Sequence, residues 1–127
     1  MELNDAEVTG PVRAAATIVM LRDAPNGLEV FLIKRHGLSD VLGGAYVFPG
    51  GKVDSGDALL DMQSHLDDQP RRLHSALGEP ALDLMAAAGI YVAALREAFE
   101  ETGVLYANGA DSALSPVRQA RDRKSVV

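Results

Sequence analysis

The chain has 127 residues, 47% hydrophobic and 24% charged, a composition typical of one folded globular domain and unlike disordered or collagen-like chains. Its net charge of −6 and its pI of about 4.9 argue against a surface that binds nucleic acid or anionic lipid. Because the chain contains no cysteine, disulfide bonds, zinc–thiolate sites and cysteine nucleophiles are excluded.

The N-terminal part of the chain predicts a β-hairpin. After a polar lead-in over residues 1–11, residues 13–22 predict a buried strand. Residues 28–34 are rich in β-forming side chains and predict the returning strand. Between them, Asn26-Gly27 supplies the positive φ angles that tight hairpin turns require.

A glycine-rich corner follows the hairpin. Residues 35–44 predict a loop, and residues 45–48 predict a short strand that leads into Pro49-Gly50-Gly51. Backbone segments can approach one another closely at two adjacent glycines, because no side chain stands in the way.

The middle of the chain predicts helices. A first helix is indicated by four apolar side chains: Leu59, Leu60, Met62 and Leu66. Pro70 and Pro80 each suit the first turn of a further helix, and Gly89 marks a break before the last one. Residues 91–102 are the strongest helical segment, which Gly103 ends.

This last predicted helix carries three glutamates on one side. At 100° per residue, Glu100 and Glu101 lie about 60° and 40° to either side of Glu97. Leu95 and Phe99 fall near the opposite side and can anchor the helix. Carboxylates at these spacings repel one another, and a hard cation such as Mg²⁺ or Mn²⁺ would relieve the repulsion. A solvated acidic face is the alternative interpretation.

The spacing of these residues resembles the signature of the Nudix hydrolases, G-x5-E-x7-R-E-U-x-E-E-x-G-U, in which U is aliphatic. Residues 51–57 match its start, with Asp57 where the family has Glu, and residues 96–104 match its end. Between them, residues 58–95 stand where the signature has seven positions. Such an insertion after a Phe-Pro-Gly-Gly corner is similar to the acyl-CoA diphosphatase branch. The resemblance covers residues 13 to about 107.

A second pattern, R-x3-G-x3-F-P-G-G, is related to CoA substrates and is half met. Gly44 to Gly51 fits it, but Asp40 stands where the pattern has Arg. Arg35 lies close along the chain and could substitute only if the loop is arranged differently.

The resemblance implies one Nudix domain over residues 1–127, an α/β fold with an α/β/α sandwich around a mixed sheet. Its expected parts are an N-terminal hairpin with the glycine corner, a helical insertion, the Nudix helix and a truncated C-terminal part: residues 12–57, 58–90, 91–103 and 104–127. Because only 24 residues follow Gly103, we expect the chain to be cut short at its C-terminal end. Ser115-Pro116 predicts one last helix, over residues 117–124.

The resemblance also implies a Mg²⁺- or Mn²⁺-dependent hydrolase that cleaves the diphosphate of a nucleoside-diphosphate derivative. It implies a catalytic, metal-binding set: Glu97, Glu100 and Glu101, with the carbonyl of Gly51 or Gly50 as a further metal ligand. Substrate-binding groups are expected from four residues: Arg35, Gly50, Gly51 and Lys52. Arg96 is expected to pair with Asp57 or Glu100 and so to orient the helix.

CoA or acyl-CoA is the expected substrate. ADP-ribose or a dinucleotide is the alternative within the family, and a non-catalytic Nudix-like module is the alternative outside enzymes. We expect no nucleic-acid or membrane partner and a cytoplasmic location, and a homodimer stays open. No apolar run spans a bilayer, and the first residues lack a signal sequence. His36, His65 and His74 show no ligand spacing and are expected at exposed or loop positions.

Overall fold

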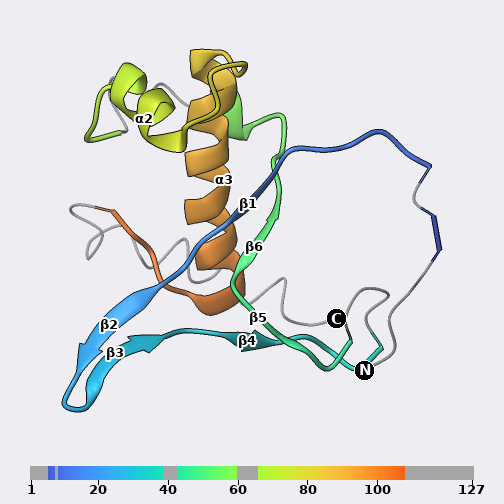
Figure 1. Ribbon diagram of the computed structural model, residues 1–127, viewed down its shortest axis with the longest axis vertical. Helices are drawn as coiled ribbons and strands as arrows, with labels where there is room; N and C mark the ends of the chain where they lie inside the picture. The colour runs from blue at the N-terminus through green and yellow to red at the C-terminus, as the bar shows by residue number, and fades with distance from the viewer. Residues whose placement is uncertain (1–5, 8, 39–42, 60–65, 108–127) are drawn as a thin grey trace.

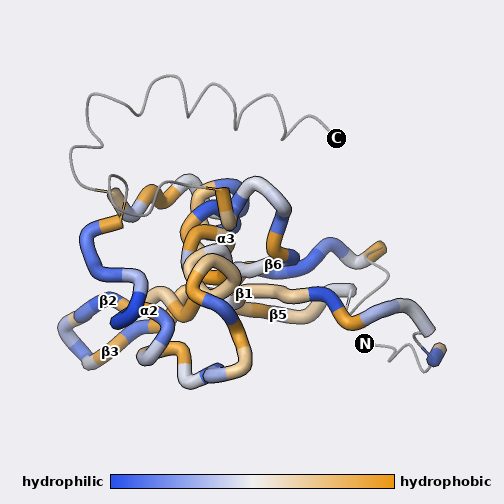
Figure 2. Tube along the Cα trace, turned by 90° about the horizontal axis from the view of Figure 1, so that it is seen from above, coloured by the Kyte–Doolittle hydropathy of each residue, from blue (hydrophilic) through white to orange (hydrophobic). Residues whose placement is uncertain are grey.

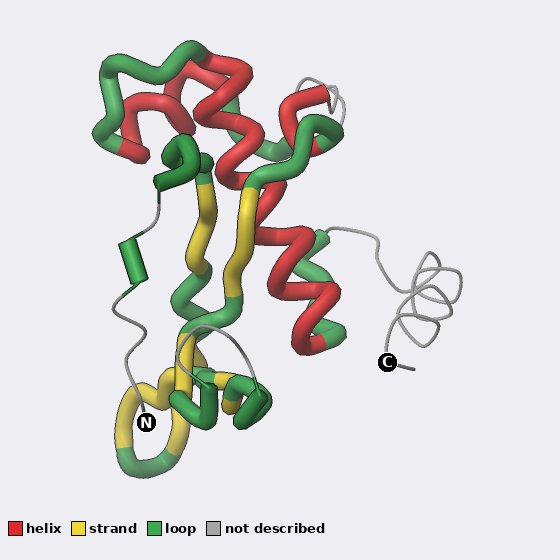
Figure 3. Tube along the Cα trace, turned by 90° about the vertical axis from the view of Figure 1, so that its right-hand side faces the viewer, coloured by secondary structure: helices red, strands yellow, loops and turns green. Residues whose placement is uncertain are grey.

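The computed structural model describes residues 6–7, 9–38, 43–59 and 66–107. Within these ranges the architecture is mixed α/β, as predicted: short strands form one layer, and the long helix α3 (Leu84–Thr102) lies against it (Figures 1 and 3). A second helical layer, as in an α/β/α sandwich, is not seen in this part of the chain. Nor does any helix found there have the length and apolar character needed to cross a bilayer.

The described strands pair in three two-stranded sheets, all antiparallel. The pairs are β1 (Ala15–Thr17) with β6 (Gly50–Lys52), β2 (Leu21–Ala24) with β3 (Gly27–Val30), and β4 (Ile33–Lys34) with β5 (Tyr46–Val47). The parallel pairing that a mixed sheet needs is not present among these strands.

The single strand predicted over residues 13–22 is divided because it changes partner. Beyond β1, the Ile18 N–H donates to the Pro49 carbonyl at 2.9 Å, and the Met20 carbonyl accepts from the Phe31 N–H at 3.0 Å. The chain thus leaves β6 and joins β3 within three residues. Side chains alternate as in a strand throughout: Ala16 and Met20 are buried, whereas Val19 is exposed.

The predicted hairpin is confirmed, with a turn of two residues. Ala24 pairs with Gly27, so Pro25 and Asn26 form the turn between β2 and β3. Gly27 has the expected positive φ, 124°, but it is the first residue of β3.

Helix α2 (Pro70–Leu77) begins at Pro70, as predicted, and ends at Gly78. The prediction that a helix begins at Pro80 is wrong. Residues 80–82 form a turn, and Asp83 caps α3 by accepting a hydrogen bond from the Ala86 N–H at 2.7 Å. The helix predicted over residues 91–102 therefore begins at Leu84, within the range predicted as insertion.

The predicted break at Gly89 is also wrong, since α3 is continuous. A Cβ at Gly89 would lie 3.3 Å from the Cβ and 3.4 Å from the Cα of Ala58. This glycine therefore lets the 3-10 turn η1 (Asp57–Leu59) pack closely on the helix. That turn replaces the start of the first predicted helix, and residues 60–65 lie outside the described ranges.

The C-terminal end of α3 follows the prediction. Gly103 has a φ of 77° and its N–H donates to the Phe99 carbonyl at 2.8 Å. The helix predicted over residues 117–124 lies outside the described residues.

Small side chains bring α3 close to the strand layer. Its buried positions are Ala87, Ala88, Gly89, Ala93, Ala98 and Phe99. Phe99 anchors the helix as expected, whereas Leu95 is only half-buried. In Figure 2 the hydrophobic segments of α3 lie next to β1, which supplies the buried Ala16. Close contact over alanines holds the acidic end of the helix near β6.

The packing at Gly89 gives a test of this fold. We expect Gly89→Leu to lower the free energy of unfolding by about 1–3 kcal/mol, because the side chain must displace the backbone of Ala58. Gly89→Ala should be near neutral, since a gain of about 1 kcal/mol in helix propensity offsets mild crowding. Urea denaturation measures both, with Met85→Leu as the control at an exposed position of α3. Equal stability of Gly89→Leu and Met85→Leu would contradict the close packing.

Candidate functional site

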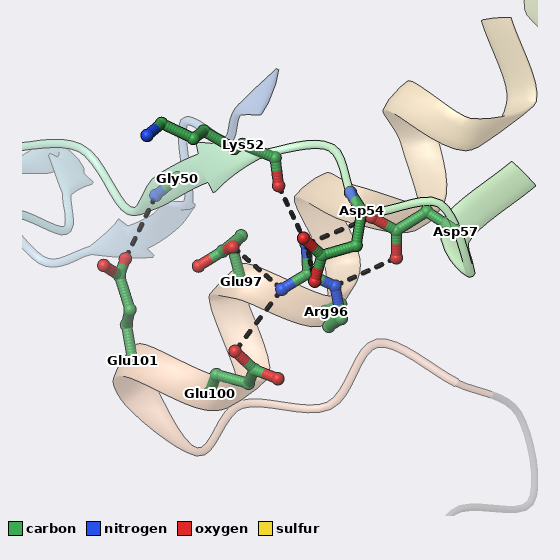
Figure 4. A network of polar contacts seen from close by, with 8 residues as sticks. All are labelled: Gly50, Lys52, Asp54, Asp57, Arg96, Glu97, Glu100 and Glu101. Atoms are coloured by element: carbon green, nitrogen blue, oxygen red, sulfur yellow. Dashed lines mark hydrogen bonds and ion pairs between the residues drawn. The ribbon is translucent and has the colours of Figure 1, made fainter. Parts of the chain in front are cut away.

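The acidic end of α3 lies along the edge of β6 that faces away from β1 (Figure 4). The Gly50 N–H donates to Oε2 of Glu101 at 3.0 Å. Two residues on, the Lys52 carbonyl accepts from Nη2 of Arg96 at 3.0 Å. Side chains of the helix thus satisfy backbone groups that a neighbouring strand would otherwise pair.

Arg96 connects this edge of β6 to acidic side chains of α3 and of the segment that follows β6. Its Nε and Nη2 donate to the two carboxylate oxygens of Asp57, at 2.9 and 3.1 Å. Its Nη1 donates to Oε1 of Glu97 at 2.8 Å and to Oε2 of Glu100 at 3.3 Å. Asp54 adds an ion pair at 3.6 Å. The predicted pairing of Arg96 is confirmed for Asp57 and for Glu100, and Figure 4 shows all four acids around its guanidinium.

Asp57 is the buried member of this network, with a side chain 4% exposed. Its Oδ2 also accepts from the Asp54 N–H at 2.8 Å, and its own N–H donates to the Asp54 carbonyl. The Arg96 hydrogen bonds hold the pKa of Asp57 below its usual value of 3.8, although burial opposes them. The same contact raises the pKa of Arg96. Both groups are therefore charged at neutral pH, and their bidentate pair fixes the helix to the turn before η1.

The two glycines of β6 are needed for two different contacts. A Cβ at Gly51 would lie 2.5 Å from Oε1 of Glu97, whereas a Cβ at Gly50 would meet the carbonyl of Ala16 and lie 2.9 Å from the Cα of Thr17. The predicted close approach is confirmed. The glycines do not form a corner, however, but pair with β1 as a strand.

The three glutamates lie within electrostatic reach of one another. Partial burial raises the pKa of Glu101, and the negative charges of Glu97 and Glu100 raise it further. The Gly50 N–H and the positive charge of Arg35 oppose this shift. The side chain of Arg35, beyond β4, is thus near enough to influence the cluster.

As the side chains stand, no three acidic or histidine groups in the described ranges converge on one metal position. Glu97 and Glu100 turn toward Arg96, whereas Glu101 turns toward Gly50 (Figure 4). The donor set is nevertheless of the right chemistry, because Mg²⁺ and Mn²⁺ prefer carboxylate oxygens. Binding would require Glu97 or Glu100 to rotate away from Arg96.

Two predicted substrate-binding residues flank the cluster. The Lys52 side chain is exposed and extends away from Arg96 in Figure 4. Arg35 is exposed, and its backbone pairs with Ala45 and Gly44. Asp40, which stands at the CoA-related position, lies outside the described residues.

The histidines take no part in the site as far as it is described. His36 is exposed and its Nδ1 accepts from the Leu38 N–H, and His74 lies in α2, 2.6 Å from the Leu82 carbonyl. Because His74 is half-buried in a helix, the exposed or loop position expected for it is wrong, and His65 lies outside the described residues. Asp54 was not predicted as part of the site, although its spacing of three residues from Asp57 is a usable signal for a shared turn.

No protein-family model matches the chain, and no solved structure matches it. The relation to the Nudix hydrolases therefore stays a prediction, and function has to be inferred from the residues of the site.

The two glycines predict different outcomes for the same substitution. Gly50→Ala should lower the free energy of unfolding by about 1–3 kcal/mol, because the new methyl group meets backbone of β1. Gly51→Ala should change it by less than about 1 kcal/mol, because the obstructing group is the mobile end of the Glu97 side chain. Urea denaturation separates the two, and side-chain NMR of Glu97 should report its displacement only in Gly51→Ala. Equal destabilisation by both changes would contradict this assignment.

The Asp57–Arg96 pair predicts acid sensitivity. Because the folded-state pKa of Asp57 lies below its unfolded value, its contribution is fully present above about pH 4 and is lost as pH falls through the folded-state pKa. Asp57→Asn should cost about 2–3 kcal/mol at pH 7 and reduce the loss of stability on acidification. The control is Glu29→Gln, in the exposed pair with Arg22, with an expected cost below about 1 kcal/mol. Equal costs at pH 7 would show that the Asp57 pair is not the stronger one.

Proposed function

We propose that the chain is a Nudix-type hydrolase that uses Mg²⁺ or Mn²⁺ to cleave the diphosphate of a nucleoside-diphosphate derivative, with CoA or acyl-CoA as substrate. One observation supports this most: the acidic end of α3 meets the glycines of β6, with Glu101 on Gly50 and Glu97 over Gly51. Residues 51 positions apart in the sequence are in direct contact there. A merely solvated acidic face would not need such a contact.

The electrostatics support a cationic ligand. The negative charges of Glu97 and Glu100 help to raise the pKa of Glu101, and Arg96 already neutralises part of the charge of Glu97 and Glu100. A divalent cation relieves the remaining repulsion better than a single guanidinium, because it carries twice the charge and accepts several oxygen ligands. The proposed ligands are Glu97, Glu100, Glu101 and the carbonyl of Gly50, which lies on the edge of β6 that faces away from β1, whereas the backbone of Gly51 faces β1.

Diphosphate hydrolysis requires water to attack phosphorus while negative charge builds up on the phosphate oxygens. Bound Mg²⁺ or Mn²⁺ supplies charge neutralisation and lowers the pKa of a water molecule. Among the residues of the chain, one of the three glutamates would also accept the proton of that water. Arg96 positions Glu97 and Glu100, while Arg35 and Lys52 offer positive charge to the phosphates.

A non-catalytic Nudix-like module is the second candidate. The hydrogen bonds of Glu97 and Glu100 to Arg96 favour it, because these carboxylates are satisfied without a metal ion. ADP-ribose and dinucleotides are the alternative substrates for an active enzyme. Metal binding and a substrate panel separate these possibilities.

We expect the protein with Mg²⁺ or Mn²⁺ to hydrolyse CoA or acyl-CoA faster than ADP-ribose, NADH or a dinucleotide, as measured by chromatography of the products. Glu100→Gln should lower kcat/KM at least 100-fold, about 2.7 kcal/mol, because it removes a charged ligand. Glu79→Gln, an exposed change outside the site, should leave the rate unchanged.

Calorimetric titration with Mg²⁺ and Mn²⁺ should show binding that Glu100→Gln weakens. Folded protein that binds neither ion and cleaves no substrate supports the non-catalytic module. Full activity in Glu100→Gln contradicts the ligand assignment, and preference for ADP-ribose contradicts the CoA assignment.

A further inference from the structure

The strand layer has one face toward α3, which lies on one side of the strands in Figure 3. On this face Ala16 and Met20 are buried, and Met20 is hydrogen-bonded to Phe31 through its carbonyl. Two positions after Phe31, Ile33 pairs with Val47, and both are half-buried. Because successive side chains of a strand point to opposite faces, the neighbours of these residues lie on the face away from α3.

This second face, called the open face below, carries a large apolar surface. Its large apolar side chains are 41–67% exposed. They are Val19, Leu21, Leu28, Val30, Leu32, Tyr46 and Phe48. Together they present roughly 600 Å² of apolar surface, at the upper end of what a monomer leaves in contact with water. A surface of this size and composition is typical of a protein–protein interface.

The charges of the open face have opposite signs at its opposite ends. Asp23 pairs with Leu28 at the end of the hairpin. Lys34 pairs with Tyr46 at the other end, where its Nζ lies 5.8 Å from the centroid of the tyrosine ring. Lys34 follows Leu28 by six positions, about 20 Å of extended chain. Two open faces with antiparallel strands therefore bring each Asp23 toward Lys34 of the other copy, whereas parallel strands would bring like charges together.

We propose that the open face is the interface of a homodimer, in which a second copy of this chain packs on it with antiparallel strands. A twofold axis across the strands produces this arrangement, because it makes the same surface meet itself. Two open faces bury about 1,200 Å² in total, at the lower end of the range for specific, stable interfaces. The net charge of −6 on each copy opposes association, so that apolar contact supplies the affinity and the Asp23–Lys34 pairs set the orientation.

The proposal does not depend on the proposed function. Because α3 lies on the other side of the strands, its three glutamates stay accessible in such a dimer (Figure 3). The oligomeric state can therefore be tested without any substrate or metal ion.

The first test measures the dissociation constant of the dimer by sedimentation equilibrium, with circular dichroism to show that each variant is folded. We expect Leu28→Ser to raise this constant at least tenfold, because it removes an apolar side chain from both halves of the interface. The matched control is Leu59→Ser, since Leu59 is 76% exposed and lies in η1, outside the open face. It should leave the constant unchanged.

The second test reverses the charges at the two ends of the open face. Asp23→Lys should raise the dissociation constant about tenfold, because it places two positive groups together at each end of the interface. Adding Lys34→Asp to this variant should restore the constant to within about threefold of the original. Glu79→Lys makes the same change in net charge at an exposed position outside the open face, and should not weaken the dimer.

Three results overturn the proposal. The first is a monomer at every concentration up to about 1 mM, which would mean that another part of the chain or a different protein covers the open face. The second is a dimer that Leu28→Ser and Leu59→Ser affect equally, because its interface then lies elsewhere. The third is equal weakening by Asp23→Lys alone and by Asp23→Lys with Lys34→Asp, which rules out the antiparallel arrangement.

Discussion

The bidentate pair between Arg96 and Asp57 is the interaction on which the rest of the site depends. It ties the last turns of α3 to the turn that follows β6, across 39 positions of the sequence. A guanidinium in a buried pair stays charged and keeps its fork geometry, so its remaining donors have fixed directions. Those donors orient Glu97 and Glu100 and bind the Lys52 carbonyl. Without this pair, Arg96 would not hold Glu97 and Glu100 in fixed positions relative to β6.

The second constraint is the absence of side chains at two positions of β6. Gly50 allows β1 to pair closely, and Gly51 leaves room for the carboxylate of Glu97. The alanines on the buried face of α3 have the same effect from the helix side, because they let the helix approach the strands. The carboxylates of Glu97 and Glu101 are thereby brought against the backbone of β6.

Local sequence signals predicted the parts of the fold that depend on neighbours in the chain. The hairpin, the first turn of α2 and the Gly103 end of α3 follow from turn and cap residues and were predicted correctly. The start of α3 was missed because Pro80 resembles a first-turn proline, whereas the hydrogen bond of Asp83 decides where the helix begins. The sequence predicts a break at Gly89 because the contact of this glycine with Ala58 is tertiary and leaves no local signal. For the site, the acidic arc and the pairing of Arg96 with Glu100 follow from helix geometry, whereas its pairing with Asp57, 39 positions away, does not. Which glutamate meets which glycine depends on how the helix docks, and no local pattern encodes it.

The bond from Gly50 to Glu101 has a consequence for how a phosphate could enter. This amide points away from β1 and already binds an anionic oxygen. Backbone N–H groups donate hydrogen bonds to carboxylate and to phosphate oxygens alike. An incoming phosphate can therefore exchange with Glu101 at this amide, so that the strand loses no hydrogen bond while the displaced carboxylate becomes available to a cation. Before substrate binds, the carboxylate of Glu101 would then occupy the position that the phosphate takes at this amide.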